Sequence, residues 1–150
     1  MESQVKVQNP SPVKNQIKRG FKIDIEKSTL ENTNFRKVLY TSKHLQLVIM
    51  SLLPGEEIGF EIHKETDQFF LFEQGHGKCI INENEYDIEN GDVVVIPAGA
   101  EHNIINVDPV AELKMYTIYA PPNHKDGVVR STKKEAETNE EEFDGTTTEP

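Results

Sequence analysis

The sequence predicts an all-β fold, a sandwich or barrel of short antiparallel strands. Short runs rich in valine, isoleucine, leucine and phenylalanine recur at regular spacing along residues 36–119. Glycine and proline separate these runs, as they do at the ends of strands. No long segment with helical periodicity lies between the runs, which argues against an α/β fold.

The individual strands follow from local pattern and from the turn signals between them. Residues 58–63 alternate apolar and polar side chains, as in a strand with two different faces. Gly75-His76-Gly77 and Asn90-Gly91 are signals for tight turns between strands. The only helical candidate is a short piece near residues 28–33. The expected strands are residues 36–41, 45–52, 58–63, 68–73, 78–82, 84–88, 92–96, 102–107 and 112–119.

Composition narrows the class of protein. The chain has 16 Lys and Arg against 26 Asp and Glu, a formal net charge of −10. This charge argues against binding nucleic acid or anionic lipid, since both require cationic residues. No apolar run approaches the roughly 20 residues that span a bilayer, and residues 1–20 lack the apolar core of a secretory signal. A lone cysteine, Cys79, excludes an intramolecular disulfide. We therefore expect a cytoplasmic protein without nucleic-acid or membrane partners.

Charge also divides the chain into a core and two tails. Residues 1–20 carry four basic residues against Glu2, and residues 131–150 carry seven acidic residues against two lysines. Polar, charged segments of this kind are typical of disorder. We expect a flexible N-terminal arm at residues 1–20, a β-barrel domain at residues 21–125 and a disordered acidic tail at residues 126–150. A docking role for this tail on a basic partner is the alternative.

Polar residues inside the strands carry the candidate chemistry. Glu61 and His63 are two positions apart, so in a strand both side chains point to the same face. Gln68 and His102 each open a later strand. If these strands are neighbours in a barrel, the four side chains can converge in its interior. Two imidazoles and one carboxylate, with open positions beside them, suit a divalent transition metal.

The spacing of these residues resembles the first of two motifs found in cupins. That motif runs Gly, five residues, His-x-His, three or four residues, Glu, six residues, Gly. The matching positions in this sequence are Gly55, Glu61, His63, Gln68 and Gly75. The spacing is kept, but a glutamate replaces the first histidine and a glutamine replaces the glutamate.

The second cupin motif is matched in full. It runs Gly, five residues, Pro-x-Gly, two residues, His, three residues, Asn. The matching positions in this sequence are Gly91, Pro97, Gly99, His102 and Asn106. The resemblance covers roughly residues 35–120, and it agrees with the independent strand pattern.

The resemblance implies a cupin jelly-roll β-barrel, also called a double-stranded β-helix, with a metal inside its mouth. Glu61 stands at the position of the first cupin histidine, and His63 and His102 match the second and third. Gln68 stands at the position of the usual glutamate, where it completes the site or binds a water. Two histidines and one carboxylate are typical of many non-haem iron sites. The favoured metals are Fe²⁺ and Mn²⁺, followed by Zn²⁺ and Ni²⁺.

Several neighbouring residues have plainer expected roles. Phe70 and Phe72 share the predicted face of Gln68, so we expect them to line the cavity. Asn106 is expected to form structural hydrogen bonds, and Cys79 to be a small buried side chain. The histidines at positions 44, 76 and 124 are expected to be structural or exposed.

Two classes of function stay open. The resemblance implies a metal-dependent enzyme acting on a small organic molecule, either a mononuclear dioxygenase or a sugar isomerase. The alternative is a non-catalytic module that binds a small ligand or has a structural role, and the changed ligand types are compatible with the weakened metal chemistry of such a module. No second acid or base stands out beside the proposed ligands. A homodimer is expected, because small cupins often dimerise and residues 4–25 could add a strand to an exposed sheet edge.

Overall fold

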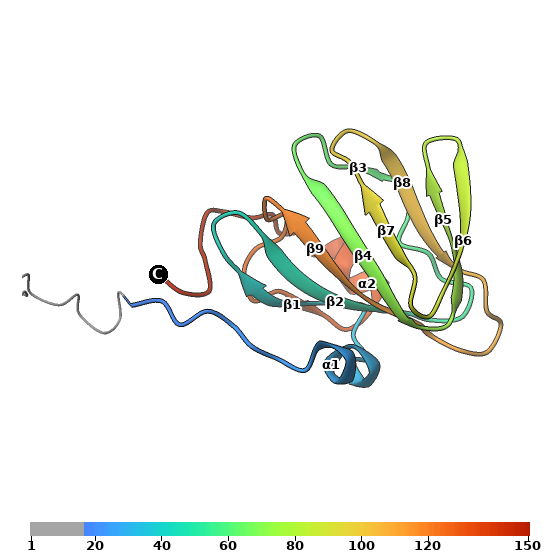
Figure 1. The fold of residues 1–150 in the computed structure, drawn as a ribbon, viewed down its shortest axis with the longest axis horizontal. Coiled ribbons are helices and arrows are strands. Elements are labelled where there is room, and N and C mark those ends of the chain that lie inside the picture. The colour runs from blue at the N-terminus through green and yellow to red at the C-terminus, as the bar shows by residue number, and fades with distance from the viewer. Residues whose placement is uncertain (1–16) are drawn as a thin grey trace, which may run out of the picture.

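The fold consists of two antiparallel sheets and two short helices, which a computed structural model describes for residues 17–150 (Figure 1). The helices are α1 (Ile25–Glu31) and α2 (Lys133–Thr138). The strands are β1 (Arg36–Thr41), β2 (Gln46–Leu52), β3 (Glu61–Ile62), β4 (Asp67–Gln74), β5 (His76–Ile81), β6 (Asn84–Glu89), β7 (Val93–Ile96), β8 (Glu101–Asn106), β9 (Leu113–Ala120) and β10 (Val129–Arg130). One sheet has the order β10-β1-β2-β9-β4-β7 and the other β3-β8-β5-β6.

The hydrophobic core lies between the two sheets, because alternate residues of each strand point inward. In β4 the buried residues are Gln68, Phe70 and Phe72, in strict alternation with more exposed neighbours. Cys79 in β5 is fully buried, as expected. Within the described residues, no helix is both long enough and apolar enough to cross a membrane.

The predicted all-β jelly-roll is confirmed, and most strands begin and end within two residues of their predicted bounds. The exception is the strand predicted at residues 58–63, which is reduced to the two residues of β3. Gly59 interrupts it with a φ of 105°, a conformation that side-chain-bearing residues rarely adopt. The Gly59 amide donates instead to the Asn103 side chain at 2.8 Å. The predicted helix is α1, which begins three residues earlier than expected because Asp24 caps it.

The prediction of a disordered tail at residues 126–150 is wrong for this structure. Strand β10 pairs with β1, and helix α2 follows it with Thr132 as its N-cap. Val128 and Ala136 are buried in the hydrophobic core. These two apolar side chains anchor a segment whose average composition is strongly acidic. The average composition of the segment therefore does not reveal the two positions whose burial holds it against the barrel.

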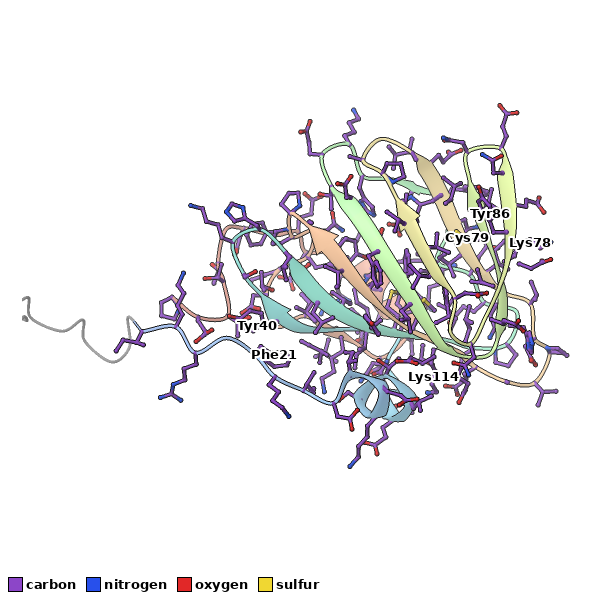
Figure 2. The ribbon with its side chains drawn as sticks, in the orientation of Figure 1. Phe21, Tyr40, Lys78, Cys79, Tyr86 and Lys114 are labelled. Carbon is purple, nitrogen blue, oxygen red and sulfur yellow. The ribbon has the colours of Figure 1, made fainter. Side chains whose placement is uncertain are left out.

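The C-terminal end of the chain meets the segment that precedes α1. Phe21 stacks on Tyr40 with ring centroids 5.2 Å apart (Figure 2). The Glu149 carboxylate accepts hydrogen bonds from the Tyr40 hydroxyl and from the backbone N–H groups of Arg19 and Gly20. Residues 17–24 form no strand. The rest of the predicted flexible arm, and most of the predicted edge strand at residues 4–25, lies outside the described residues.

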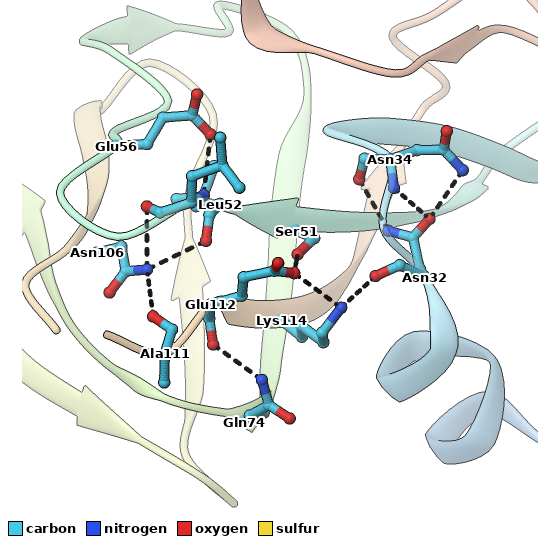
Figure 3. A network of polar contacts seen from close by, with 11 residues as sticks. Asn32, Asn34, Ser51, Leu52, Glu56, Gln74, Asn106, Ala111, Glu112 and Lys114 are labelled. Carbon is cyan, nitrogen blue, oxygen red and sulfur yellow. Dashed lines mark hydrogen bonds and ion pairs between the residues drawn. The ribbon is translucent and has the colours of Figure 1, made fainter. Parts of the chain in front are cut away.

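Helix α1 is tied to the outer face of the larger sheet by a buried lysine. Lys114 in β9 donates to the carbonyl oxygen of Asn32, just beyond the end of α1 (Figure 3). Its ammonium group also pairs with the Glu112 carboxylate at 3.1 Å. The Ser51 hydroxyl donates to the same carboxylate at 2.8 Å. This network gives the buried ammonium group the partners that its burial requires.

Asn106, the last residue of the second motif, has the structural role expected of it. Its side chain is fully buried, and its amide nitrogen lies within 3.1 Å of three backbone carbonyl oxygens (Figure 3). These carbonyl groups belong to Leu52, Leu53 and Ala111. The side chain therefore ties the end of β8 to the loop that follows β2 and to the loop that precedes β9.

Candidate metal centre

The pairing of β3 with β8 brings together three residues that could hold a metal ion. Glu61 lies directly opposite His102 in the register of these two strands. His63 follows β3 by one residue. One potential ligand atom from each of the three residues lies within 4.8 Å of the other two. Two imidazoles and one carboxylate therefore converge at one point on the four-stranded sheet.

Strand β3 is turned so that its polar side faces inward. Phe60 and Ile62 are 56% and 52% exposed, whereas the side chains of Glu61 and His63 are 29% and 13% exposed. Alternation alone favours the opposite orientation, with the apolar residues buried. Exposing two large apolar side chains in order to bury a carboxylate and an imidazole opposes stability. Such a cost is typical of a functional site.

The ring nitrogens of both histidines are arranged as metal ligands require. Nε2 of His63 is buried and lies 2.9 Å from Oε1 of Glu61, but it makes no hydrogen bond with any described residue. Nδ1 of His102 lies 3.1 Å from the carbonyl oxygen of Ala100. A carbonyl can only accept, so this contact places a proton on Nδ1 and leaves the Nε2 lone pair of His102 free. Metal-binding histidines are usually oriented in this way.

The electrostatics of the site favour the protonation states in which these groups bind metals. Burial would raise the pKa of Glu61, but the nearby His63, Arg36 and His102 together lower it. Burial lowers the pKa of His102, against the opposing effects of the Ala100 carbonyl and of Glu61. A carboxylate and a neutral imidazole are the forms that coordinate a divalent cation. The residues present therefore fit a transition metal.

Gln68 reaches toward the barrel interior from the facing sheet. Its Nε2 donates to the Thr117 hydroxyl at 3.0 Å, while its Oε1 is buried and has no partner among the described residues. An unpaired buried acceptor is costly unless something occupies the space beside it. The amide oxygen is therefore available to a metal or to a water molecule. The histidines at positions 44 and 76 do not belong to the three-residue cluster.

A cavity of about 480 Å³ adjoins the cluster. Glu61 and His63 line one part of it, and residues between Asn123 and Glu142 line another. The C-terminal segment therefore helps to enclose the site. Phe70 and Phe72 were expected to line a cavity, but they do not line this one: both rings are fully buried and stack with their centroids 5.9 Å apart. The strand pattern predicts which face of β4 these two rings lie on, but not how deeply they are buried.

Two further residues beside the cluster were not predicted as functional. The Tyr119 hydroxyl lies 3.2 Å from Nε2 of His124, and the Tyr119 ring meets the His63 ring edge-on at 5.7 Å. Burial raises the pKa of Tyr119 and lowers the pKa of His124 well below its usual value, so both side chains are neutral near pH 7. The side chain of Gln46 holds the backbone of His124 through two hydrogen bonds, of 2.7 and 2.9 Å. Only long-range contacts bring His124 to the site, so no local sequence signal could identify it.

Comparison with known proteins agrees with this architecture. Residues 48–119 match the family described as "Cupin domain". The chain is 41% identical over 124 residues to the uncharacterized protein YrkC of Bacillus subtilis (strain 168), covering 79% of this chain and 66% of that protein. It is also 41% identical over 110 residues to the uncharacterized protein L612 of Acanthamoeba polyphaga mimivirus, covering 71% of this chain and 69% of that protein. The chain thus spans about two thirds of the length of these curated relatives.

A solved structure extends the agreement to three dimensions. The BH2720 protein of Bacillus halodurans is 38% identical and superposes with a TM-score of 0.78, covering 81% of this chain and 96% of that one. The two spaced motifs, from Gly55 to Asn106, lie within the segment that matches this family, and the chain has the two-sheet barrel. The family match and the structural similarity establish that this chain belongs to the cupin family.

Proposed function

We propose that this protein binds a divalent transition metal through Glu61, His63 and His102, and that it acts on a small organic molecule in the adjoining cavity. The supporting observation is the convergence of three ligand atoms within 4.8 Å, with Nε2 of His63 buried only 2.9 Å from Oε1 of Glu61. Fe²⁺ and Mn²⁺ are favoured over Zn²⁺ and Ni²⁺, because the set combines carboxylate oxygen with imidazole nitrogen.

Different residues of the chain have different roles in the proposed site. When bound, the metal supplies Lewis acidity or an open coordination position. Glu61 supplies the only negative charge of the three-residue cluster, and the Ala100 carbonyl orients His102. The wall formed by the C-terminal segment shields a bound molecule from bulk water. A cavity of about 480 Å³ is of the size that holds small metabolites.

Oxidation of the bound molecule with O₂ is the favoured reaction class. The set of two histidines and one carboxylate is typical of non-haem iron oxygenases. Isomerisation is the second candidate, and a separate observation favours it. The neutral Tyr119–His124 pair lies beside His63, and His124 itself lines the cavity. A phenol and an imidazole in contact can deliver a proton to a bound molecule and remove one from it. Oxygen uptake would mark the first class, and deuterium incorporation from D₂O the second.

The metal-binding part of the proposal can be tested by calorimetric titration of metal-free protein with Mn²⁺. We expect about one Mn²⁺ per chain, with affinity reduced by at least about 10- to 100-fold in Glu61→Gln and His102→Ala, since each removes a proposed ligand. His76→Ala is the matched control, because the His76 side chain is 66% exposed and lies outside the cluster. Equal affinity in wild type and His102→Ala would contradict the assignment. A ligand that binds but is recovered unchanged would instead favour a non-catalytic module.

A further inference from the structure

Two arginines face each other on the wall of the cavity. Arg36 in β1 is the direct register partner of Arg130 in β10, and both side chains line the cavity. Directly opposed residues of an antiparallel pair share one face of the sheet, with their Cβ atoms about 5 Å apart. Like charges in this arrangement are destabilising unless negative charge lies beside them.

Only one member of this pair forms an ion pair within the described part of the chain, although Arg36 is near enough to Glu61 to lower the pKa of that carboxyl. Nη2 of Arg130 donates to the Glu141 carboxylate at 2.9 Å and to the Asn139 carbonyl oxygen at 2.7 Å. The Nε–H group of Arg36 is buried and has no hydrogen-bond partner among residues 17–150. Arg36 also takes part in none of the ion pairs that these residues form.

The Arg36 guanidinium is nevertheless held in place. Its Cζ atom lies 5.3 Å from the centroid of the Phe35 ring, a cation–π contact. A positioned guanidinium with unused donors, facing a cavity, has the form of an anion-binding site. Glu61 and His63 line the same cavity. An anion bound to Arg36 would therefore lie in the same cavity as two of the proposed metal ligands.

We propose that Arg36 anchors a carboxylate group of the small molecule that occupies the cavity. This proposal rests on the proposed function, because it names a chemical feature of the molecule that the same site would bind. A carboxylate matches the two-pronged hydrogen-bonding face of one guanidinium, and its single charge offsets the one arginine of the pair that forms no ion pair.

The acidic side of the cavity favours a carboxylate over a phosphate. The C-terminal segment contributes a run of glutamates to the lining. These glutamates would repel a phosphate group, which carries up to two negative charges on one centre, more strongly than a carboxylate group, which carries one. Arg130, the second arginine, is already paired with one of these glutamates. The lining glutamates of this segment are Glu137, Glu140, Glu141 and Glu142.

Succinate is a suitable probe, because it is small and has no other reactive group. Each of its two carboxylates carries one charge, and two methylene groups separate them, so a single carboxylate can meet Arg36. Metal-free protein would be titrated with succinate while the NMR signal of the Arg36 Nε–H group is followed. We expect a saturable shift of this signal, and binding weakened at least about tenfold in Arg36→Gln through loss of a charge-assisted pair. Lys133→Gln is the matched control, since Lys133 lines the same cavity but should leave binding within about twofold.

Thermal unfolding provides a second measurement that does not depend on the NMR signal. Succinate should raise the Tm of wild type and of Lys133→Gln but not that of Arg36→Gln. Without succinate, Arg36→Gln should be at least as stable as wild type, because it removes one of two opposed positive charges. Equal succinate binding in wild type and Arg36→Gln would overturn the proposal, as would inorganic phosphate binding as tightly as succinate.

Mn²⁺ binding by the same variants separates this proposal from the proposed function. Arg36→Gln retains all three proposed metal ligands, so it should still bind about one Mn²⁺. If Mn²⁺ binds and succinate does not, the carboxylate subsite is wrong and the metal centre stands. If succinate binds through Arg36 and no metal binds, the metal centre is wrong and the carboxylate subsite stands.

Discussion

Gln68 donates a hydrogen bond to the Thr117 hydroxyl at 3.0 Å, and its own amide oxygen is buried without a partner. This contact explains how a neutral amide is held at the position where the resemblance to cupins places a glutamate. The Thr117 hydroxyl fixes the nitrogen of the amide, so its oxygen must turn elsewhere. A buried acceptor without a partner has a free-energy cost that a bound metal or water would remove.

Gln68→Glu should therefore make the stability of the protein depend more strongly on metal. Without metal, the added buried carboxylate should lower the free energy of unfolding by about 1–3 kcal/mol. With Mn²⁺, a carboxylate is the better ligand, so the rise in Tm on adding Mn²⁺ should exceed that of wild type. Gln74→Glu is the control on the same strand, and it should show no enhanced response to Mn²⁺. An unchanged Mn²⁺ response in Gln68→Glu would contradict a place for Gln68 at the centre.

The packing of the C-terminal segment can be tested at Ala136. This side chain is 4% exposed in the core, so Ala136→Lys would place an unpaired charge there and should cost about 1–3 kcal/mol. Amide hydrogen exchange of residues 128–143 should accelerate much more than that of the strands. Glu137→Lys introduces the same residue at the exposed neighbouring position and should leave exchange unchanged. Equally fast exchange of this segment in wild type and Ala136→Lys would argue against its docking on the barrel.

The ion pair beneath α1 should contribute to stability in a pH-dependent way. The Ser51 hydrogen bond, followed by Lys114, lowers the pKa of Glu112 below its ordinary value. Its contribution is therefore present above the unfolded-state pKa of about 4.3 and is lost as the pH falls through the lower folded-state pKa. At pH 7, Glu112→Gln should lower the free energy of unfolding by about 1–3 kcal/mol, because Lys114 stays buried.

Urea denaturation of wild type and Glu112→Gln at several pH values measures this contribution directly. The difference between the two proteins should be constant from pH 7 to about 5 and should narrow below about pH 4. Glu85→Gln is a control, since Glu85 belongs to an exposed pair with Lys78 and should matter little at any pH. A difference that persists undiminished at low pH would contradict the role assigned to the Glu112 carboxylate.

The expected homodimer has a suitable surface on the outer face of the larger sheet. Phe69 in β4 is the register partner of Val95 in β7 and of Ile118 in β9, so these apolar side chains form a continuous row. Val95 is 60% exposed and Val93 is 48% exposed. Contiguous apolar surface of this kind is typical of an interface between proteins. We expect a second copy of the chain to cover it.

Val95→Lys should then shift the protein from dimer toward monomer, as measured by light scattering coupled to size-exclusion chromatography. Val107→Lys is the control, because Val107 is also about half exposed but lies outside the row. A monomeric mass for wild type at all accessible concentrations would contradict the predicted homodimer.

The sequence was sufficient to predict most of the fold, because strand alternation and turn residues act locally. Residues 36–41 form β1 with the bounds expected, and Pro97 and Asn90-Gly91 lie at strand ends as predicted. The spacing of the two motifs also indicated which residues to examine for a metal site. These signals depend on residues that are close together in the chain.

What the sequence could not provide depends on contacts between distant residues. His124 reaches the site because Gln46 binds its backbone, and Arg36 faces Arg130 because β10 joins the edge of the larger sheet. Strand alternation would favour burying the apolar Ile62 and exposing Glu61, but the structure has Glu61 facing inward and Ile62 exposed. In each case the deciding interaction lies elsewhere in the chain, beyond what local composition can indicate.

Elemental analysis of the purified, untagged protein, expressed without added metal, tests the central claim most directly. A His63→Ala/His102→Ala double variant, prepared in parallel, is the control. The metal centre predicts about one equivalent of a transition metal per wild-type chain, with iron or manganese favoured, and almost none in the double variant. No metal in the wild type, and none taken up on adding Fe²⁺, Mn²⁺, Zn²⁺ or Ni²⁺, would contradict it.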